Sequence, residues 1–174
     1  LIQQHDIKRV VWNRCYEPWQ IKRDTQLKHA LIKAGIDVQS FNSHLLWEPW
    51  QVLKKDETPY KVFTPYYRRG CLSKAPPRMP VEAPKDLKVK YIPQFDKGLD
   101  SLELMPEINW HATIETMWTP GEQGAAKHLS DFLPNGAKDY KNKRDIPDLG
   151  ATSKLSPHLH FGEISPNQIW YAAI

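Results

Sequence analysis

The first forty residues switch between two spacings of apolar positions. Residues 7–12 form a short run rich in β-branched and aromatic side chains, which predicts a strand. From Pro18 onward the apolar positions recur at helical spacing and stop before Gly35; they are Leu27, Ala30, Leu31 and Ala34. Residues 36–39 alternate again as a strand would. Strand, helix and strand at this spacing predict a βαβ unit with parallel strands, and a complete sheet of this kind would need further strands.

The middle of the chain is aromatic and interrupted by proline. Residues 44–69 predict a loop that leads to a short helix beginning at Thr64-Pro65. No lasting period follows between residues 74 and 110, where six prolines occur: Pro76, Pro77, Pro80, Pro84, Pro93 and Pro106. This composition favours an extended linker between two domains.

Beyond residue 113 the pattern is helical. Residues 119–122 (Thr-Pro-Gly-Glu) predict a capping box, in which the threonine oxygen and the glutamate each satisfy a free amide. The stripe behind it consists of Ala125, Leu129, Phe132 and Leu133. Ser156-Pro157 and Ser165-Pro166 predict two more helix starts, the second with Gln168 at the capping-box position. The predicted fold class is therefore α/β, with residues 1–73 as part of a doubly wound parallel sheet, 74–112 as a Pro-rich linker and 113–174 as the start of an all-α domain.

Composition adds a mild preference for anionic partners. The 174 residues carry a net charge of +4, and the excess lies in residues 1–75, with 13 cationic against 7 acidic side chains. Such a charge permits a nucleic-acid partner without requiring one. The two cysteines, Cys15 and Cys71, form no CxxC pair, so we expect a reducing, cytoplasmic setting. No apolar run is long enough to span a bilayer, so we expect no membrane association.

The candidate chemistry lies in residues 152–156, Thr-Ser-Lys-Leu-Ser. Three hydroxyls and consecutive amides before a predicted helix make a cradle for an anion such as a diphosphate, and Lys154 adds a positive charge. The plainer alternative is that Thr152 and Ser156 only cap helices. His158 and His160 are two residues apart on the same predicted helix and do not face each other, so we predict no metal site.

Several segments together resemble the DNA photolyase and cryptochrome family. They are residues 11–19 (VWNRCYEPW), 60–68 (YKVFTPYYR), 118–125 (WTPGEQGA) and 140–147 (YKNKRDIP), and the resemblance runs from about residue 10 to residue 170. Within the family the chain is most similar to bacterial class I cyclobutane pyrimidine dimer photolyases. The resemblance identifies residues 1–73 with part of the α/β antenna domain and 113–174 with the start of the FAD-binding domain.

The resemblance also implies site residues. Tyr140 corresponds to a tyrosine that contacts FAD, and Arg144 corresponds to an arginine that touches the backbone of the damaged DNA strand. The segment that holds the FAD phosphates corresponds to Thr152, Ser153, Lys154, Leu155 and Ser156. The family often has glycine where this chain has Ala151. No catalytic residue can be assigned, because the family's substrate-contacting and electron-relay residues correspond to positions beyond Ile174.

The antenna chromophore is left open. Members of the family that bind methenyltetrahydrofolate use an acidic residue a few positions after a Tyr-Glu pair, and here Gln20 stands at that position after Tyr16-Glu17. Glutamine forms hydrogen bonds but carries no charge. Methenyltetrahydrofolate, a deazaflavin and no antenna at all are therefore three open alternatives.

The implied activity is light-driven repair of cyclobutane pyrimidine dimers in DNA, by electron transfer from excited reduced FAD. A cryptochrome, which shares the fold and the flavin but signals instead of repairing, is the first alternative. The second is an inert piece, since the chain reads as an internal fragment of a longer protein and holds only part of a flavin pocket. We expect a monomer whose partner is damaged DNA.

Overall fold

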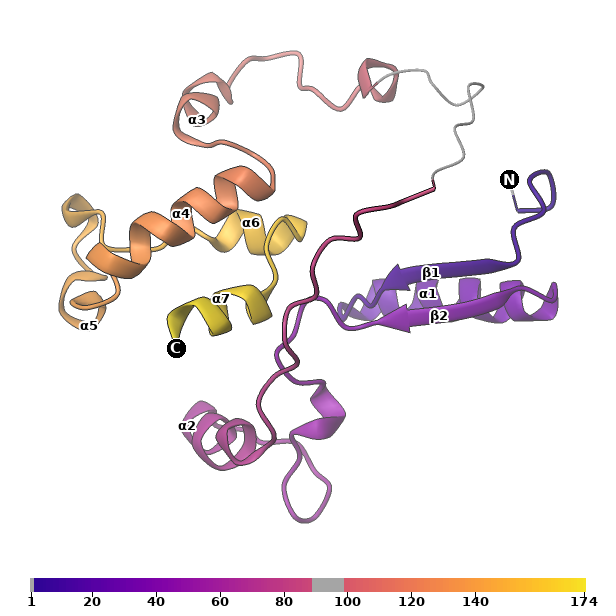
Figure 1. The fold of residues 1–174 in the computed structure, drawn as a ribbon, viewed down its shortest axis with the longest axis horizontal. Coiled ribbons are helices and arrows are strands. Elements are labelled where there is room, and N and C mark those ends of the chain that lie inside the picture. Colours follow the sequence, from indigo (N-terminus) through magenta and orange to yellow (C-terminus); the bar gives the residue numbers. More distant parts are fainter. Residues whose placement is uncertain (1, 89–98) are drawn as a thin grey trace.

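The computed structural model describes residues 2–88 and 99–174. Figure 1 shows an α/β part on the right, a group of helices on the left and a long segment that crosses between them. A small helical lobe around α2 lies at the bottom of the view, below the crossing point, where this segment passes between the two parts. This arrangement places the mixed α/β and helical parts side by side, with the crossing segment in contact with both.

The predicted βαβ unit is confirmed. Strand β1 (Arg9–Asn13) is followed by helix α1 (Pro18–Lys33) and strand β2 (Asp37–Phe41). The strands are parallel, with Val10 opposite Val38. Gly35 has φ +77°, a left-handed conformation that favours glycine and ends the helix as predicted.

The middle segment forms a chain of short turns. Residues 49–51 form a 3₁₀ helix, Pro49–Gln51, and Leu53 pairs with Pro59 in an antiparallel bridge. The predicted short helix is found one residue early, as α2 (Phe63–Pro65), and it continues as a π-helical turn (Tyr66–Gly70) and a 3₁₀ turn (Cys71–Ser73).

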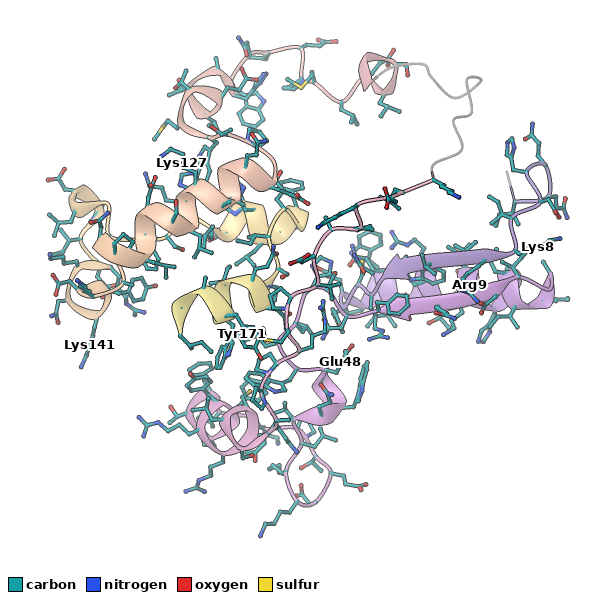
Figure 2. The ribbon with its side chains drawn as sticks, viewed as in Figure 1. Lys8, Arg9, Glu48, Lys127, Lys141 and Tyr171 are labelled. Carbon is teal, nitrogen blue, oxygen red and sulfur yellow. The ribbon has the colours of Figure 1, made fainter. Side chains whose placement is uncertain are left out.

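The crossing segment is fixed by hydrogen bonds to its backbone. Residues 74–88 contain no helix or strand, residues 89–98, which include Pro93, lie outside the described residues, and Leu99–Leu102 form a 3₁₀ helix. The Tyr171 hydroxyl donates to the Pro77 carbonyl at 2.5 Å, and the Asn167 amide donates to the Arg78 carbonyl at 2.8 Å. Figure 2 shows Tyr171 on α7 beside this segment. The segment is thus held against the last helix, while the predicted domain boundaries stay a prediction.

Two tryptophans complete the contact between the parts. The Trp47 indole donates to the Ala75 carbonyl at 3.0 Å, and its ring meets Trp170 edge-on at 5.6 Å between centroids. An edge-to-face pair at this distance is favourable beyond the area that it buries. Trp47 therefore links the loop after β2 to both the crossing segment and α7.

The helical part packs around a small apolar core. Its helices are α3 (Ala112–Met117), α4 (Glu122–Asn135), α5 (Tyr140–Lys143), α6 (Ser156–Phe161) and α7 (Pro166–Ala173), and a 3₁₀ helix spans Pro147–Leu149. Ala125 and Leu129 from α4 meet Leu155 and Ile164 in the core. The predicted stripe thus faces inward at Ala125 and Leu129, while Phe132 and Leu133 are only partly buried.

One of the two predicted capping boxes is correct. Ser165 caps α7, since its hydroxyl accepts from the Gln168 amide while the Gln168 side chain accepts from the Ser165 amide. The box at residues 119–122 is wrong: α4 begins at Glu122, and its N-cap is Gly121, which has no side chain to cap the helix. Ser156 likewise lies inside α6, which has Leu155 as its N-cap. Gly121 has φ +94°, so the chain turns into α4 through backbone geometry instead.

Within the residues that the structure describes, no helix has the length and apolar character needed to cross a bilayer.

Candidate functional site

The loop before α6 is anchored at both ends and open in the middle. Ala151 is 6% exposed and Leu155 is 3% exposed, and Leu155 belongs to the helical core. Gly150 and Lys154 both have φ +54°, so the chain turns sharply on either side of Thr152 and Ser153. Gly150, and not Ala151, takes the left-handed conformation, which explains why alanine is accommodated at position 151. The loop is therefore a rigid bend with two apolar anchors.

Between these anchors the polar groups face outward. Thr152 and Lys154 are exposed, as is Ser156 just after the second anchor, and Ser153 is half-buried with its hydroxyl 3.4 Å from the Leu155 amide. An anion at this bend would meet hydroxyls and one ammonium group. Helix α6 has only six residues, so any anion affinity would come from the loop rather than from the helix dipole. The side chain of Leu155 points into the core, which leaves only its backbone for a ligand.

Tyr140 begins α5 and Arg144 is the C-cap residue that follows it. The Tyr140 ring packs edge-on against Phe132 of α4 at 5.9 Å between centroids, and 40% of the residue stays exposed. The Arg144 guanidinium carbon lies 5.8 Å from the centre of the Tyr140 ring, and its Nε lies 3.5 Å from an oxygen of Asp145. The structure thus places Tyr140, to which the family resemblance assigned FAD, next to Arg144, to which it assigned the DNA backbone.

A buried histidine lies in α6, the helix that follows the loop. His158 of α6 is 2% exposed, and its Nδ1 lies 2.5 Å from a carboxylate oxygen of Glu163. The hydrogen bond to His158, together with the Gly121 amide, lowers the pKa of Glu163. The His158 ring also packs against His128 and Trp118, at 5.3 and 5.8 Å between centroids. This cluster joins the start of α4 to α6, and His160 takes no part in it.

We expect this cluster to make folding sensitive to acid. Burial, followed by the charges of His158 and Lys154, lowers the pKa of His128 below its ordinary value of 6.5. The unfolded chain then binds that proton more readily, so stability falls as the pH drops below about 6.5. Glu163 acts in the same direction at lower pH, because its depressed pKa gives stability that is lost below about 4.5.

Thermal unfolding followed at a series of pH values between 7.5 and 5 measures this effect. The melting temperature should fall with pH, and a His128→Asn variant should show a shallower fall. An identical slope for both proteins would mean that His128 does not contribute.

A second candidate site lies between the two parts of the molecule. A hollow of about 680 Å³ is bounded by Tyr16, Gln20 and Leu45 on the α/β side and by Ser156 and Leu159 on the helical side. The side-chain oxygen of Gln20 is buried and has no hydrogen-bond partner among the described residues. An acceptor of this kind fits a ligand that carries an N–H or O–H donor.

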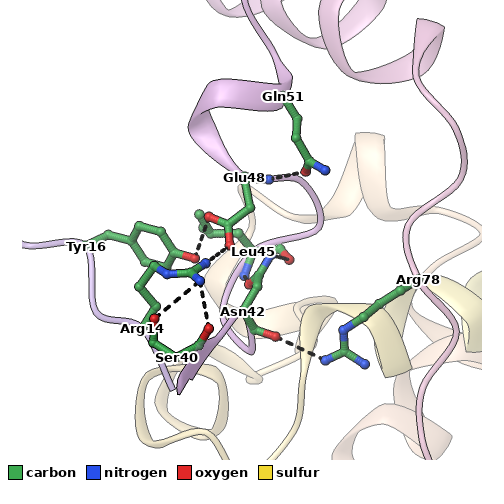
Figure 3. Close-up of polar contacts among 8 residues, drawn as sticks. All are labelled: Arg14, Tyr16, Ser40, Asn42, Leu45, Glu48, Gln51 and Arg78. Carbon is green, nitrogen blue, oxygen red and sulfur yellow. Dashed lines mark hydrogen bonds and ion pairs between the residues drawn. The ribbon is translucent and has the colours of Figure 1, made fainter. Parts of the chain in front are cut away.

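Tyr16, which lines this hollow, also belongs to a polar network that the sequence did not predict (Figure 3). Arg14, at the end of β1, forms an ion pair with Glu48 and donates to the Ser40 carbonyl at 2.8 Å. The Tyr16 hydroxyl donates to the other oxygen of Glu48 at 2.8 Å. Burial, followed by the bond to Glu48, raises the pKa of Tyr16. Glu48 is 7% exposed, so its charge depends on these partners and fixes the loop after β2 against β1.

The comparisons with known proteins agree with this architecture. A sequence model of the family described as DNA photolyase matches residues 1–85. A deoxyribodipyrimidine photo-lyase of Agrobacterium fabrum is 39% identical over 99% of this chain, and cryptochrome-1 of Arabidopsis thaliana is 31% identical over 98%. The crystal structure of a bacterial class III photolyase from Agrobacterium tumefaciens superposes with a TM-score of 0.91 at 38% identity over 98% of the chain.

The chain therefore belongs to the DNA photolyase and cryptochrome family, as the resemblance of its motifs indicated. It spans about a third of the length of these relatives: 36% of the Agrobacterium fabrum photo-lyase and 25% of the Arabidopsis cryptochrome. Structures of this family bind FAD. The sequence resemblance indicated class I, whereas the Agrobacterium tumefaciens structure is described as class III, so the class of this chain is not assigned.

Proposed function

We propose that the loop of residues 150–156 holds the diphosphate of FAD. The observation that best supports this proposal is the geometry of the loop, in which buried Ala151 and Leu155 hold exposed Thr152 and Lys154 at a fixed bend. Thr152, Ser153 and Ser156 would donate hydroxyl hydrogen bonds, and Lys154 would offset the negative charge. Tyr140 would contact the flavin from α5. The cofactor, when bound, supplies the redox chemistry, while these residues bind and orient it.

We further propose that the protein carrying this chain is a photolyase that repairs cyclobutane pyrimidine dimers in DNA in a light-dependent reaction. The support is the 39% identity to a deoxyribodipyrimidine photo-lyase across nearly the whole chain. A dimer stacks poorly, which lowers the cost of turning it out of the duplex toward the flavin. The direct test is light-dependent splitting of a thymine dimer by the complete gene product.

Arg144 would hold the backbone of the damaged strand. Its side chain is 53% exposed and its contact with Asp145 is long, so the guanidinium is available to a phosphate. We expect Arg144→Ala to weaken binding of damaged DNA and to reduce the salt slope, which is the change in log affinity with log salt, by about one.

The matched control for Arg144 is Lys141→Ala. Lys141 lies on α5, which Arg144 ends as the C-cap, and Figure 2 shows Lys141 projecting away from this helix. Titrations of a labelled dimer-containing duplex at several salt concentrations compare the two variants. An unchanged slope for Arg144→Ala would remove this residue from the phosphate contacts.

For the antenna chromophore, we propose the hollow between the two parts as the site. The buried side-chain oxygen of half-buried Gln20, which has no hydrogen-bond partner among the described residues, is the supporting observation, because a bound chromophore with a donor group would satisfy it. Methenyltetrahydrofolate and a deazaflavin are the two candidate chromophores, and a protein without an antenna is the third alternative. Absorption spectra of purified Gln20→Leu protein test the site, since an antenna band of undiminished height would argue against it.

A cryptochrome photoreceptor is the second candidate, supported by the 31% identity to Arabidopsis cryptochrome-1. Such a protein would bind FAD without splitting dimers. The third candidate, an inert piece, applies to the 174 residues on their own. We expect these residues alone to bind FAD weakly or not at all, and tight one-to-one binding in an FAD titration would contradict this.

A further inference from the structure

The net positive charge of the chain equals the excess of cationic side chains in one short segment. Residues 53–74 carry six cationic and two acidic side chains, and the remaining residues carry 18 of each. The whole net charge of +4 therefore resides in these 22 residues. The cationic residues are Lys54, Lys55, Lys61, Arg68, Arg69 and Lys74. Charge gathered in this way creates a local field that attracts anions.

The fold gathers four of these side chains around one depression. Residues 53–59 form a tight turn, in which Leu53 pairs with Pro59 and the Lys54 amide donates to the Thr58 carbonyl at 2.9 Å. The helical segment of residues 63–73 lies beside this turn, in the lobe below the crossing point in Figure 1. Lys54, Lys55, Arg69 and Lys74 line a depression of about 680 Å³ together with Tyr60 and Ser73, and we call it the basic hollow.

Close packing at Gly70 places Arg69 in the wall of this hollow. Gly70 is buried, and a Cβ atom there would lie 2.7 Å from a methyl carbon of Val52 and 3.1 Å from the ring of Tyr60. Only glycine allows the π-helical turn to approach the loop so closely. Val52 is 2% exposed, which makes this contact part of the lobe's interior. The position of Arg69 is therefore set by packing rather than by a flexible loop.

The charges of the hollow are largely unneutralised. Lys54 forms an ion pair with Asp56 at 3.3 Å. In the part of the chain that the structure describes, no ion pair involves Lys55, Arg69 or Lys74, and no acidic residue lines the hollow. Like charges held near one another repel, and a phosphate between them would relieve that repulsion.

We propose that the basic hollow binds backbone phosphates of DNA outside the lesion. This inference rests on the proposed DNA substrate and adds a contact that is separate from Arg144 at the end of α5. Lysine and arginine around a depression recognise phosphate without reading bases. The contact is therefore indifferent to sequence and to damage, and it contributes to the affinity for undamaged duplex as well as for the lesion site.

The test uses the complete gene product and an undamaged duplex in the dark. Lys55→Gln combined with Arg69→Gln should weaken binding about tenfold at fixed salt and reduce the salt slope by about two. The matched control is Lys22→Gln combined with Lys33→Gln, which removes two exposed charges from α1 and should leave the slope unchanged. Equal melting temperatures of the two double variants would show that folding is intact.

The outcomes separate this inference from the proposed repair activity. An unchanged slope in the hollow variant would overturn the inference, whether or not the protein repairs dimers in light. A reduced slope would support the hollow even if no repair is seen, because the measurement needs neither flavin nor light. If the variant instead loses binding to vesicles containing anionic lipid and keeps its DNA affinity, the hollow is a lipid site and the inference is wrong.

Discussion

In the complete gene product, replacing Thr152 by aspartate should greatly weaken the proposed binding of FAD. The new carboxylate would stand on the exposed bend between Ala151 and Leu155, next to the proposed position of the diphosphate. Two like charges about 4 Å apart near a protein surface repel by several kcal/mol. We therefore expect the affinity for FAD to fall about 100-fold or more. The flavin absorbance of the purified protein and an FAD titration of the apoprotein measure this directly.

Two further variants separate charge from folding. Thr113→Asp places the same side chain on an exposed position of α3, away from the loop, and should retain flavin. Lys154→Gly removes the positive charge but suits φ +54°, so it should weaken flavin binding without lowering the melting temperature. Full flavin content in Thr152→Asp would show that the diphosphate lies elsewhere.

The second large effect is expected on stability, at Gly124. This glycine is buried in the first turn of α4, and a Cβ atom there would lie 1.7 Å from the Thr119 carbonyl oxygen and 2.8 Å from its carbon. Neither α4 nor the turn before it can yield cheaply, because Ala125 next to Gly124 is fully buried. We expect Gly124→Ala to cost roughly 3 kcal/mol or more, and so to lower the melting temperature by roughly 10 °C.

Gly150→Ala is the matched control for Gly124. Gly150 has φ +54°, but apart from the glycine and its two chain neighbours no heavy atom of the described residues lies within 4 Å of the place that an added methyl group would take, so alanine there meets backbone strain without a clash. The cost should be about 1 kcal/mol. Thermal melts of the two variants compare the steric clash at position 124 with the backbone strain at position 150. Equal decreases in melting temperature would mean that the chain relaxes around position 124 at little cost.

The regular elements could be predicted because their signals are local. The alternation at residues 36–39 and the helical spacing that ends at Gly35 depend only on neighbouring residues, and both elements are found within one or two positions. The Ser165 capping box is similarly local. The predicted capping box at residues 119–122 does not form, because the Thr119 carbonyl packs against Gly124. Gly121 is therefore the N-cap of α4.

The site features that escaped prediction depend on residues far apart in the chain. Glu48 is buried because Arg14 and Tyr16, more than thirty positions earlier, reach it from the end of β1. The contact between His158 and Glu163 spans only five positions, yet its burial depends on Trp118 and His128. The basic hollow had a visible signal, the cations of residues 53–74, but only the packing of Gly70 gathers them.

The most direct test of the central claim is the repair of a thymine-dimer oligonucleotide by the complete gene product, with flavin bound and reduced, in blue light and in the dark. The intact dinucleotide should return only in light, and Thr152→Asp should abolish the activity while Thr113→Asp keeps it. Absence of light-dependent splitting by protein that holds reduced FAD would contradict the assignment as a pyrimidine dimer photolyase and favour a cryptochrome.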